Sequence, residues 1–339
     1  MSIQGGLDLA LSRGKEAGCD AIQIFSKSSN QWKAKPLQDT EIARFHKART
    51  ETGVTPVMIH SAYLINLCTP KEYDWQKSVE AFYVEMERAE ALGIPYLVLH
   101  PGAHLQSGEE AGIARAAQAL NLLHERAAGF QVKVLIELTA GQGTCIGHRF
   151  SHVGGILNQI KEEGRVGVCF DTCHVFAAGY DFRTKEGYEE TISLFDKEIG
   201  LSRLCAFHMN DCKKELGCRV DRHDHIGQGK MGLAPFSHLI NDSRFIGLPM
   251  ILETPKGKDC KEDKMNLATL RGLEASASSG NSGPLGRWQA RPATIIADPL
   301  GRLGLSEERG AAASECGVWG HCEQGEQAPT LNCRLCLPL

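Results

Sequence analysis

Short apolar, β-branched runs alternate with segments of helical periodicity along the first 255 residues of the chain. After each run comes a polar turn, and then a stretch in which apolar residues recur every three or four positions. The runs predict seven strands, at 21–25, 54–60, 96–100, 133–139, 166–172, 204–211 and 249–255. Buried strands alternating with helices are typical of a parallel sheet, and their regular repetition favours a closed α/β fold, the TIM (β/α)8 barrel.

The first strand of such a barrel is missing or truncated. The chain begins with MSIQGGLD, which is typical of a turn, and passes directly into the helical stretch LDLALSRGKEAG. A barrel without its first strand leaves two strand edges unpaired. We therefore expect either that the chain starts further upstream or that its barrel closes imperfectly.

The amino-acid composition changes after about residue 273, where Gly, Ala, Ser and Pro become frequent and no helical or strand periodicity is sustained. This predicts a barrel domain at 1–272 and a disordered or weakly ordered tail at 273–339. The tail cysteines, spaced C-x5-C and C-x2-C, are compatible with a zinc site but do not predict one; they are Cys316, Cys322, Cys333 and Cys336. The other nine cysteines are expected to be buried and unpaired, as in most cytosolic proteins.

Composition excludes few classes of protein. Hydrophobic residues make up 42% and charged residues 23% of the 339 positions, as in ordinary globular proteins. No apolar run reaches the length of a membrane span, and the polar N-terminus does not resemble a signal peptide, so we expect a cytoplasmic protein. The net charge of −4 does not by itself indicate a nucleic-acid-binding protein.

A potential metal ligand stands at the end of nearly every predicted strand. The strand ends supply His60, His100, Glu137, Asp171, His208 and Glu253, and the loops add His174, Asp221 and His223. The carboxyl ends of barrel strands meet at one mouth. A lone histidine there is more often a core residue, but packing does not explain six ligands in succession, because buried carboxylates and imidazoles are costly unless paired or bound to a cation. Five histidines with four carboxylates favour a cluster of two or three zinc or manganese ions.

The sequence around these residues resembles the endonuclease IV family of apurinic/apyrimidinic (AP) endonucleases over roughly residues 1–272. The resemblance is carried by HSAYLINL, LHPGAH, IELTAGQGT, GVCFDTCHVFAAGYD, HMND, RVDRHDHIGQG and ILET. It implies a TIM-type barrel with three zinc ions, some of which manganese can replace. One ion would be held by His60 and His100, with Glu137 bridging to a second held by Asp171, His208 and Glu253; the third would be held by His174, Asp221 and His223.

The resemblance also implies the reaction. The family cuts double-stranded DNA 5′ to an abasic site, with a metal-bound hydroxide as nucleophile, and leaves a 3′-hydroxyl and a 5′-deoxyribose phosphate. Four carboxylates and three zinc ions would give the site a local charge of about +2, which attracts phosphate although the whole chain is negative. We expect a monomer.

Two loops match those with which the family penetrates the duplex and holds the sugar flipped out. Gln31 and Tyr63 match the inserted side chains, and Asn30 stands where some members have an Arg. We expect Trp32 to anchor its loop by packing. Leu138 stands where the family often has an Asn, which would alter a hydrogen bond beside the bridging acid.

Two other hypotheses remain open at this stage. A sugar isomerase or epimerase of the related barrel type also places Glu, Asp and His at strand ends, but it has no need of the third set, His174 with Asp221 and His223. The missing first strand and the unusual tail would also suit an inactive, truncated copy of an enzyme.

Overall fold

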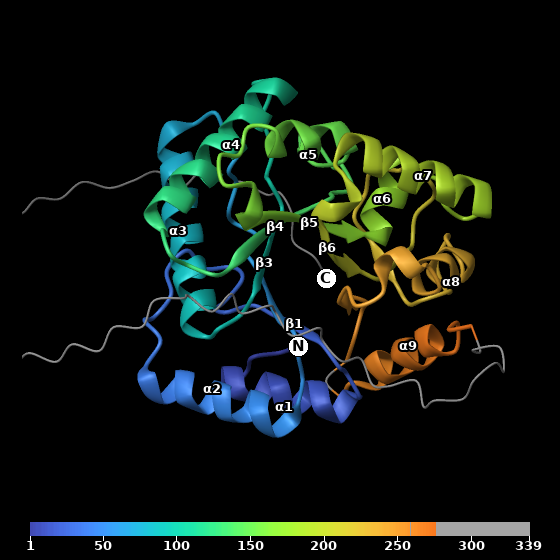
Figure 1. Ribbon diagram of the computed structural model, residues 1–339, viewed down its shortest axis with the longest axis horizontal. Helices are drawn as coiled ribbons and strands as arrows, with labels where there is room; N and C mark the ends of the chain where they lie inside the picture. Colours follow the sequence, from blue (N-terminus) through green and yellow to red (C-terminus); the bar gives the residue numbers. More distant parts are fainter. Residues whose placement is uncertain (258, 276–339) are drawn as a thin grey trace, which may run out of the picture. The chain divides into compact units, whose positions relative to one another are not determined.

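Seven parallel strands form one sheet in the order β1-β2-β3-β4-β5-β6-β9 (Figure 1). The structure, a computed structural model, describes residues 1–257 and 259–275, so the predictions for the tail beyond 275 lie outside the described residues. The strands are β1 Ile22–Ile24, β2 Val57–His60, β3 Tyr96–Leu99, β4 Lys133–Glu137, β5 Val166–Asp171, β6 Leu204–His208 and β9 Met250–Ile251. The seven predicted strands of a TIM barrel are therefore confirmed, each within its predicted run.

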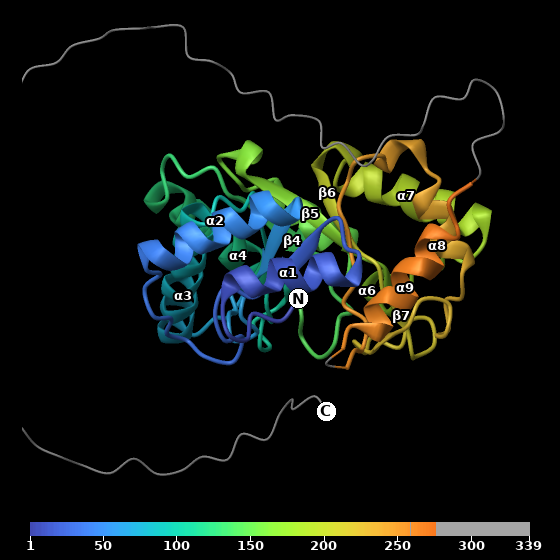
Figure 2. The same cartoon turned by 90° about the horizontal axis from the view of Figure 1, so that it is seen from below.

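The helices lie on the outside of the sheet, most of them between successive strands, with the first before β1 and the last after β9 (Figure 1, Figure 2). They are α1 Leu7–Ala17, α2 Asp39–Thr52, α3 Glu72–Ala91, α4 Glu109–Arg126, α5 Phe150–Leu157, α6 Thr172–Ala178, α7 Lys185–Glu198, α8 Ala234–Ile240 and α9 Lys261–Arg271. Short 3-10 helices occupy Glu163–Arg165, Leu201–Arg203 and Ser243–Phe245, and β7 Asp211–Cys212 pairs antiparallel with β8 His223–Asp224. No helix in the described part of the chain is both long enough and apolar enough to span a bilayer.

Side chains alternate between the two faces of each strand, so the sheet has two apolar layers. The inner layer takes one residue from each of six strands: Met58, Val98, Leu135, Cys169, Ala206 and Ile251. The outer layer, between sheet and helices, contains Ile59, Leu97, Ile136, Phe170 and Phe207. Of the nine cysteines in the described residues, four are buried and form no disulfide, as expected from the sequence: Cys68, Cys169, Cys173 and Cys212. The other five are only half-buried, contrary to that expectation.

The sheet is open between β1 and β9, which are its two ends. Among the described residues no strand precedes α1, and the amino group of Met1 donates to the carbonyl of Gln23. A cavity of about 30 Å³ remains between the two strands. We call this gap the seam; its lining includes Met1, Ile22, Gln23, Met250, Ile251 and Leu252. The expectation of imperfect closure is thus confirmed.

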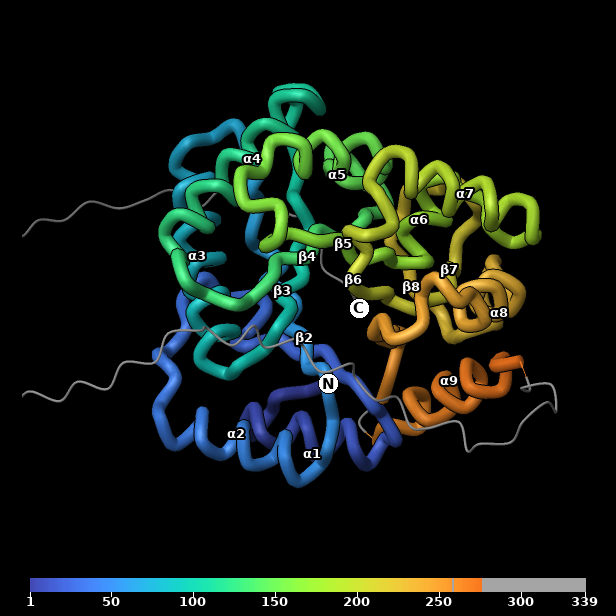
Figure 3. The backbone as a smooth tube through the Cα atoms, in the orientation of Figure 1, coloured from blue at the N-terminus to red at the C-terminus, as the bar shows by residue number. Residues whose placement is uncertain are grey.

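The outside of the seam is covered by α1 and α9, which contact each other (Figure 3). The Arg271 guanidinium donates to the carbonyl of Gly18 at 2.8 Å and to the carboxylate of Asp20 at 2.9 Å. These bonds join the end of α9 to the turn before β1. Side chains and helices, rather than a strand ladder, therefore close this part of the barrel.

Candidate metal centre

The nine residues predicted as ligands all lie at the carboxyl ends of the strands or in the loops that follow them. His60, Glu137, Asp171 and His208 are the last residues of β2, β4, β5 and β6. His100 comes directly after β3, and Glu253 comes two residues after β9. His174 lies in the first turn of α6, and the β7–β8 hairpin supplies Asp221 and His223. Because parallel strands all end at the same mouth, residues far apart in sequence converge there.

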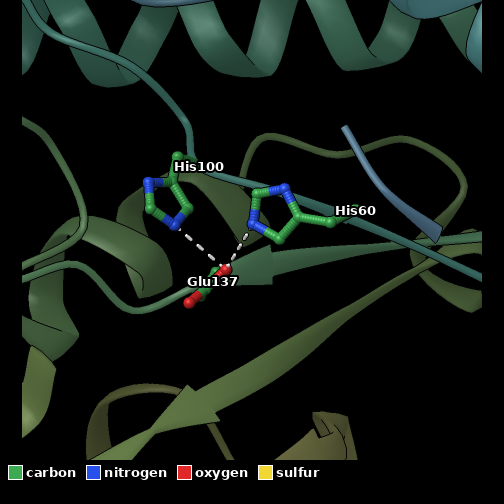
Figure 4. A group of neighbouring side chains, drawn as sticks. All are labelled: His60, His100 and Glu137. Carbon is green, nitrogen blue, oxygen red and sulfur yellow. Dashed lines mark hydrogen bonds and ion pairs between the residues drawn. The ribbon is translucent and has the colours of Figure 1, made fainter. Parts of the chain in front are cut away.

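Glu137 lies between two groups of ligands. Its Oε2 atom is 3.0 Å from Nε2 of His60 and 3.0 Å from Nε2 of His100 (Figure 4). Its Oε1 atom is 3.0 Å from Nδ1 of His208. One carboxylate oxygen therefore faces each side, as a bridging ligand requires.

A second group forms around His208. Its Nδ1 atom lies 3.2 Å from Oε2 of Glu253 and 3.8 Å from Oδ2 of Asp171. The candidate ligand atoms of these three residues and of Glu137 all lie within 4.8 Å of one another. Four donors around one point are the number that a zinc ion takes.

A third group lies around the β7–β8 hairpin. The carboxylate of Asp221 is 3.1 Å from Nε2 of His174 and 3.2 Å from Nε2 of His223. Ligand atoms of Asp171, His174 and His223 also gather within 4.8 Å, which places Asp171 between the second and third groups. The three sets expected from the resemblance are therefore adjacent in space.

Hydrogen bonds at the far side of the imidazole rings test whether metal ions fit these groups. Nδ1 of His60, His174 and His223 donates to the carbonyls of Ser61, Leu138 and Glu253, at 2.8, 2.9 and 3.1 Å. A neutral ring with its proton on Nδ1 leaves a lone pair on Nε2, which points into the site. Nε2 of His174 and of His223 is buried and meets no hydrogen-bond geometry, although the Asp221 carboxylate lies 3.1 and 3.2 Å away. Ring nitrogens without a proton and a carboxylate that face one another across a buried space fit a bound cation.

The pKa values of the acidic residues also fit a bound cation. Burial raises the pKa of Glu137, but His208 and His100 outweigh it and hold that pKa well below its usual range. Burial likewise raises the pKa of Glu253, but His208 lowers it to about 2. These carboxylates are ionised at neutral pH, which is the form that binds a cation.

Asn210 and Gln23 touch candidate ligands, although neither was predicted as a site residue. Asn210 is fully buried; its amide donates to Oδ2 of Asp171 at 2.7 Å and accepts from the main-chain N–H of Glu253 at 2.8 Å. Its position in HMND, two residues after His208, was the available signal. For Gln23 the only signal was a polar residue inside the apolar run AIQIF.

The residues predicted to contact DNA lie beside the mouth. Asn30 and Gln31 are exposed on the turn after β1, and Tyr63 is 64% exposed after β2. The Tyr63 ring packs edge-on against Phe25, with centroids 5.3 Å apart. Trp32 is partly buried against the core, as expected of a packing anchor.

The turn after β1 is held from beneath by a buried ion pair. Nζ of Lys27 lies 3.2 Å from the carboxylate of Glu85 and donates to the carbonyl of Gln31 at 2.7 Å. The same carboxylate accepts from the N–H of Ala62, next to Tyr63. One acid on α3 thus supports both loops.

A fourth group of possible ligands, Glu109, His148 and His152, lies apart from these three sets. Arg149 is 3.0 Å from the carboxylate of Glu109, and Arg219 is 2.8 Å from Nε2 of His148. Two guanidinium groups already engage two of the three candidate ligands and would repel a cation. We therefore assign this group to ion pairing.

Comparison with known proteins shows the fold family and then the enzyme family of this chain. Residues 11–275 match the family described as xylose isomerase-like TIM barrel. A probable endonuclease 4 of Chloroflexus aurantiacus is 50% identical over 277 residues, which cover 82% of this chain and 97% of the relative. The crystal structure of endonuclease IV from Thermus thermophilus is 34% identical, with a TM-score of 0.71, and the match covers 80% of this chain and 96% of that one. The chain belongs to the endonuclease IV family and is an endonuclease.

The same fold occurs in sugar-converting enzymes. A D-tagatose 3-epimerase-like protein matches 80% of this chain and 95% of its own, at 19% identity and a TM-score of 0.62. Identity this low shows the shared barrel alone. It gives no support to the isomerase or epimerase hypothesis beyond the fold.

Proposed function

We propose that this protein is a zinc-dependent AP endonuclease that acts as a monomer on duplex DNA. It hydrolyses the phosphodiester 5′ to an abasic site and leaves a 3′-hydroxyl and a 5′-deoxyribose phosphate. The observation that carries the proposal is the position of Glu137. Its Oε2 atom is 3.0 Å from His60 and His100, and its Oε1 atom is 3.0 Å from His208. We assign this activity to residues 1–272 and treat 273–339 as a separate tail.

Three groups of side chains would hold three zinc ions, and manganese could replace zinc in part. The first group is His60, His100 and Glu137; the second is Glu137, Asp171, His208 and Glu253; the third is His174, Asp221 and His223. When bound, the ions would supply Lewis acidity. They would lower the pKa of water and offset the negative charge of the phosphate. Hydrolysis adds water across the bond between phosphorus and the 3′ oxygen.

The side chains of this protein contribute orientation. The carbonyls of Ser61, Leu138 and Glu253 fix which imidazole nitrogens face the site, so no ring has to turn during the reaction. Leu138 offers only its main-chain carbonyl to His174, so this hydrogen bond does not need the Asn often found at that position. Glu137 and Glu253 have pKa values below their usual range, so both present ionised carboxylates to a cation.

We further propose that Gln31 and Tyr63 enter the duplex at the lesion, with Asn30 beside them. All three are exposed at the mouth, and the ring centroid of Tyr63 stands 6.0 Å from that of His60. A side chain that fills the gap left by a missing base stabilises an extruded sugar. Asn30 is short and neutral, so it should fill that gap less well than an Arg.

The test uses the full chain, loaded with zinc, and a labelled duplex with one abasic site. We expect one cut, 5′ to the lesion, with a 3′-hydroxyl that a polymerase can extend, and no cut in the undamaged duplex of the same sequence. Removal of metal with a chelator should abolish cleavage, and added zinc should restore it.

Three outcomes would contradict the proposal. Equal cleavage of both duplexes would show a nuclease without lesion specificity. Cleavage that survives complete removal of metal would exclude the three sites as the source of activity. Absence of cleavage in protein that holds its full complement of zinc would support the inactive-copy hypothesis instead.

A further inference from the structure

Gln23, in the middle of β1, contacts two of the proposed ligands at once. Its Oε1 atom lies 2.9 Å from Nε2 of His208, and its Nε2 atom donates to Oε1 of Glu253 at 2.6 Å. The side chain is buried. The orientation of the amide follows from chemistry, because an ionised carboxylate only accepts hydrogen bonds and so must face the NH2 group.

The first contact determines which nitrogen of His208 faces the metal site. The carbonyl oxygen of Gln23 can only accept, so Nε2 of His208 carries a proton. In a neutral ring the lone pair is then on Nδ1, which lies 3.0 Å from Glu137 and 3.2 Å from Glu253. His60, His174 and His223 use main-chain carbonyls for the same purpose, and His208 uses a side chain.

The second contact holds Glu253 in place. The amide of Gln23 occupies Oε1, which leaves Oε2 turned toward Nδ1 of His208. Glu253 needs this support because it follows β9, a strand of two residues that pairs with β6 on one side and faces the seam on the other. Its side chain is also 26% exposed, whereas Glu137 and Asp171 are fully buried.

We propose that Gln23 is a positioning residue for the second metal group, acting from β1 across the seam. It fixes the proton of His208 and the rotamer of Glu253 and so takes the place of a strand contact at the mouth. This inference rests on the proposed assignment of His208 and Glu253 as ligands. It predicts that Gln23 controls the retention of one metal ion and not of the others.

The test is Gln23→Met, which keeps the volume of the side chain and removes both hydrogen bonds. Zinc-loaded protein is dialysed against a graded series of chelator concentrations, and the zinc left per chain is measured. Loss of an outer hydrogen-bond partner typically weakens metal binding by about 10- to 100-fold. We expect one ion to leave at correspondingly lower chelator strength while the remaining ions leave as in the parent protein.

The controls separate positioning from folding. Gln159→Met makes the same substitution at an exposed glutamine after α5 and should leave zinc retention unchanged. Thermal unfolding of the metal-free proteins should give the same Tm for Gln23→Met and for the parent. If Gln23→Met does not fold, Gln23→Leu is measured in its place.

Two results would overturn the inference: unchanged retention of every ion, or equal weakening of all ions with a lower Tm of the metal-free protein. Neither readout involves DNA. Protein that retains zinc as expected but does not cut abasic DNA would therefore contradict the proposed function and leave the role of Gln23 intact.

Discussion

The block formed by β4, β5 and β6 and the seam between β1 and β9 are built differently. β4 and β5 are joined by four registered residue pairs, as are β5 and β6, whereas β9 makes two pairs with β6 and none with β1. Glu137, Asp171 and His208 end the strands of the block. Glu253 and Gln23 lie at the seam and depend on side-chain hydrogen bonds. The protein thus places its proposed central ligands on strands with more backbone pairing and supports the proposed peripheral ligand by side chains.

The sharpest test of this difference compares Glu137→Ala with Glu253→Ala. Removing Glu137 takes a donor from two groups, which should reduce incision by on the order of 10³-fold or more, equivalent to about 4 kcal/mol of transition-state stabilisation. Removing Glu253 affects one group and should cost on the order of 10²-fold. Single-turnover incision of the abasic duplex measures both, and Glu109→Ala, from the ion-paired fourth group, should cut as the parent does. Equal losses at Glu137 and Glu253 would remove the distinction between central and peripheral ligands.

The loss of folding stability should also be larger for a substitution in the block than for one at the seam. Phe207 on β6 is fully buried, with Phe245 and Phe170 at centroid distances of 5.0 and 5.6 Å, and Phe207→Ala should cost about 3–5 kcal/mol. Ile251→Ala opens space beside the seam, where neighbours can move in, so its cost should be near the lower end for this change, about 2 kcal/mol. Denaturant unfolding of the metal-free proteins gives both values. A larger loss at Ile251 would show that the seam is packed as rigidly as the block.

The sequence was sufficient to predict the strands and candidate ligands of the block, but it predicted the structure of the seam only in part. Parallel strands end at one mouth, so the order of ligands along the chain already placed Glu137, Asp171 and His208 together. The turn chemistry of MSIQGGLD likewise predicted that these first residues form no strand before α1. Strand length at the seam was overestimated, because the apolar run 249–255 contains a strand of only two residues. A single run does not reveal whether a neighbouring strand is present to pair with it.

Contacts between side chains far apart in the chain could not be predicted from the sequence. Gln23 and Glu253 are 230 positions apart, and only the folded chain shows that they meet. Lys27 lies in a polar stretch typical of solvated charges, yet it is buried in an ion pair with Glu85. Asn210 was inside a quoted motif, but no local pattern shows that its amide joins Asp171 to the main chain of Glu253. Such roles depend on tertiary geometry.

Acid should lower the free energy of unfolding of the protein through His124. This residue of α4 is 1% exposed, neither ring nitrogen has a hydrogen-bond partner, and burial together with Arg165 lowers its pKa from 6.5 to about 4. The unfolded chain binds a proton near pH 6.5 and the folded chain only near pH 4, so stability falls as the pH drops through this window, by up to about 3 kcal/mol. His124→Leu should lose less stability between pH 6.5 and 4 than the parent in urea titrations. Parallel curves for the two proteins would show that His124 is not the acid-sensitive group.

The smallest effect is expected outside the seam, at the ion pair between Arg271 and Asp20. The side chains are 50% and 65% exposed, so Arg271→Ala should cost less than about 1 kcal/mol, and less still at high salt. Its consequence should be local: amide hydrogen exchange in β1 should accelerate, while exchange in β5 stays unchanged. If Arg271→Ala instead destabilised the protein as much as Ile251→Ala, the outer contact between α9 and the turn before β1 would be the main closure of the barrel. The apolar lining of the seam and the hydrogen bonds of Gln23 would then be secondary to it.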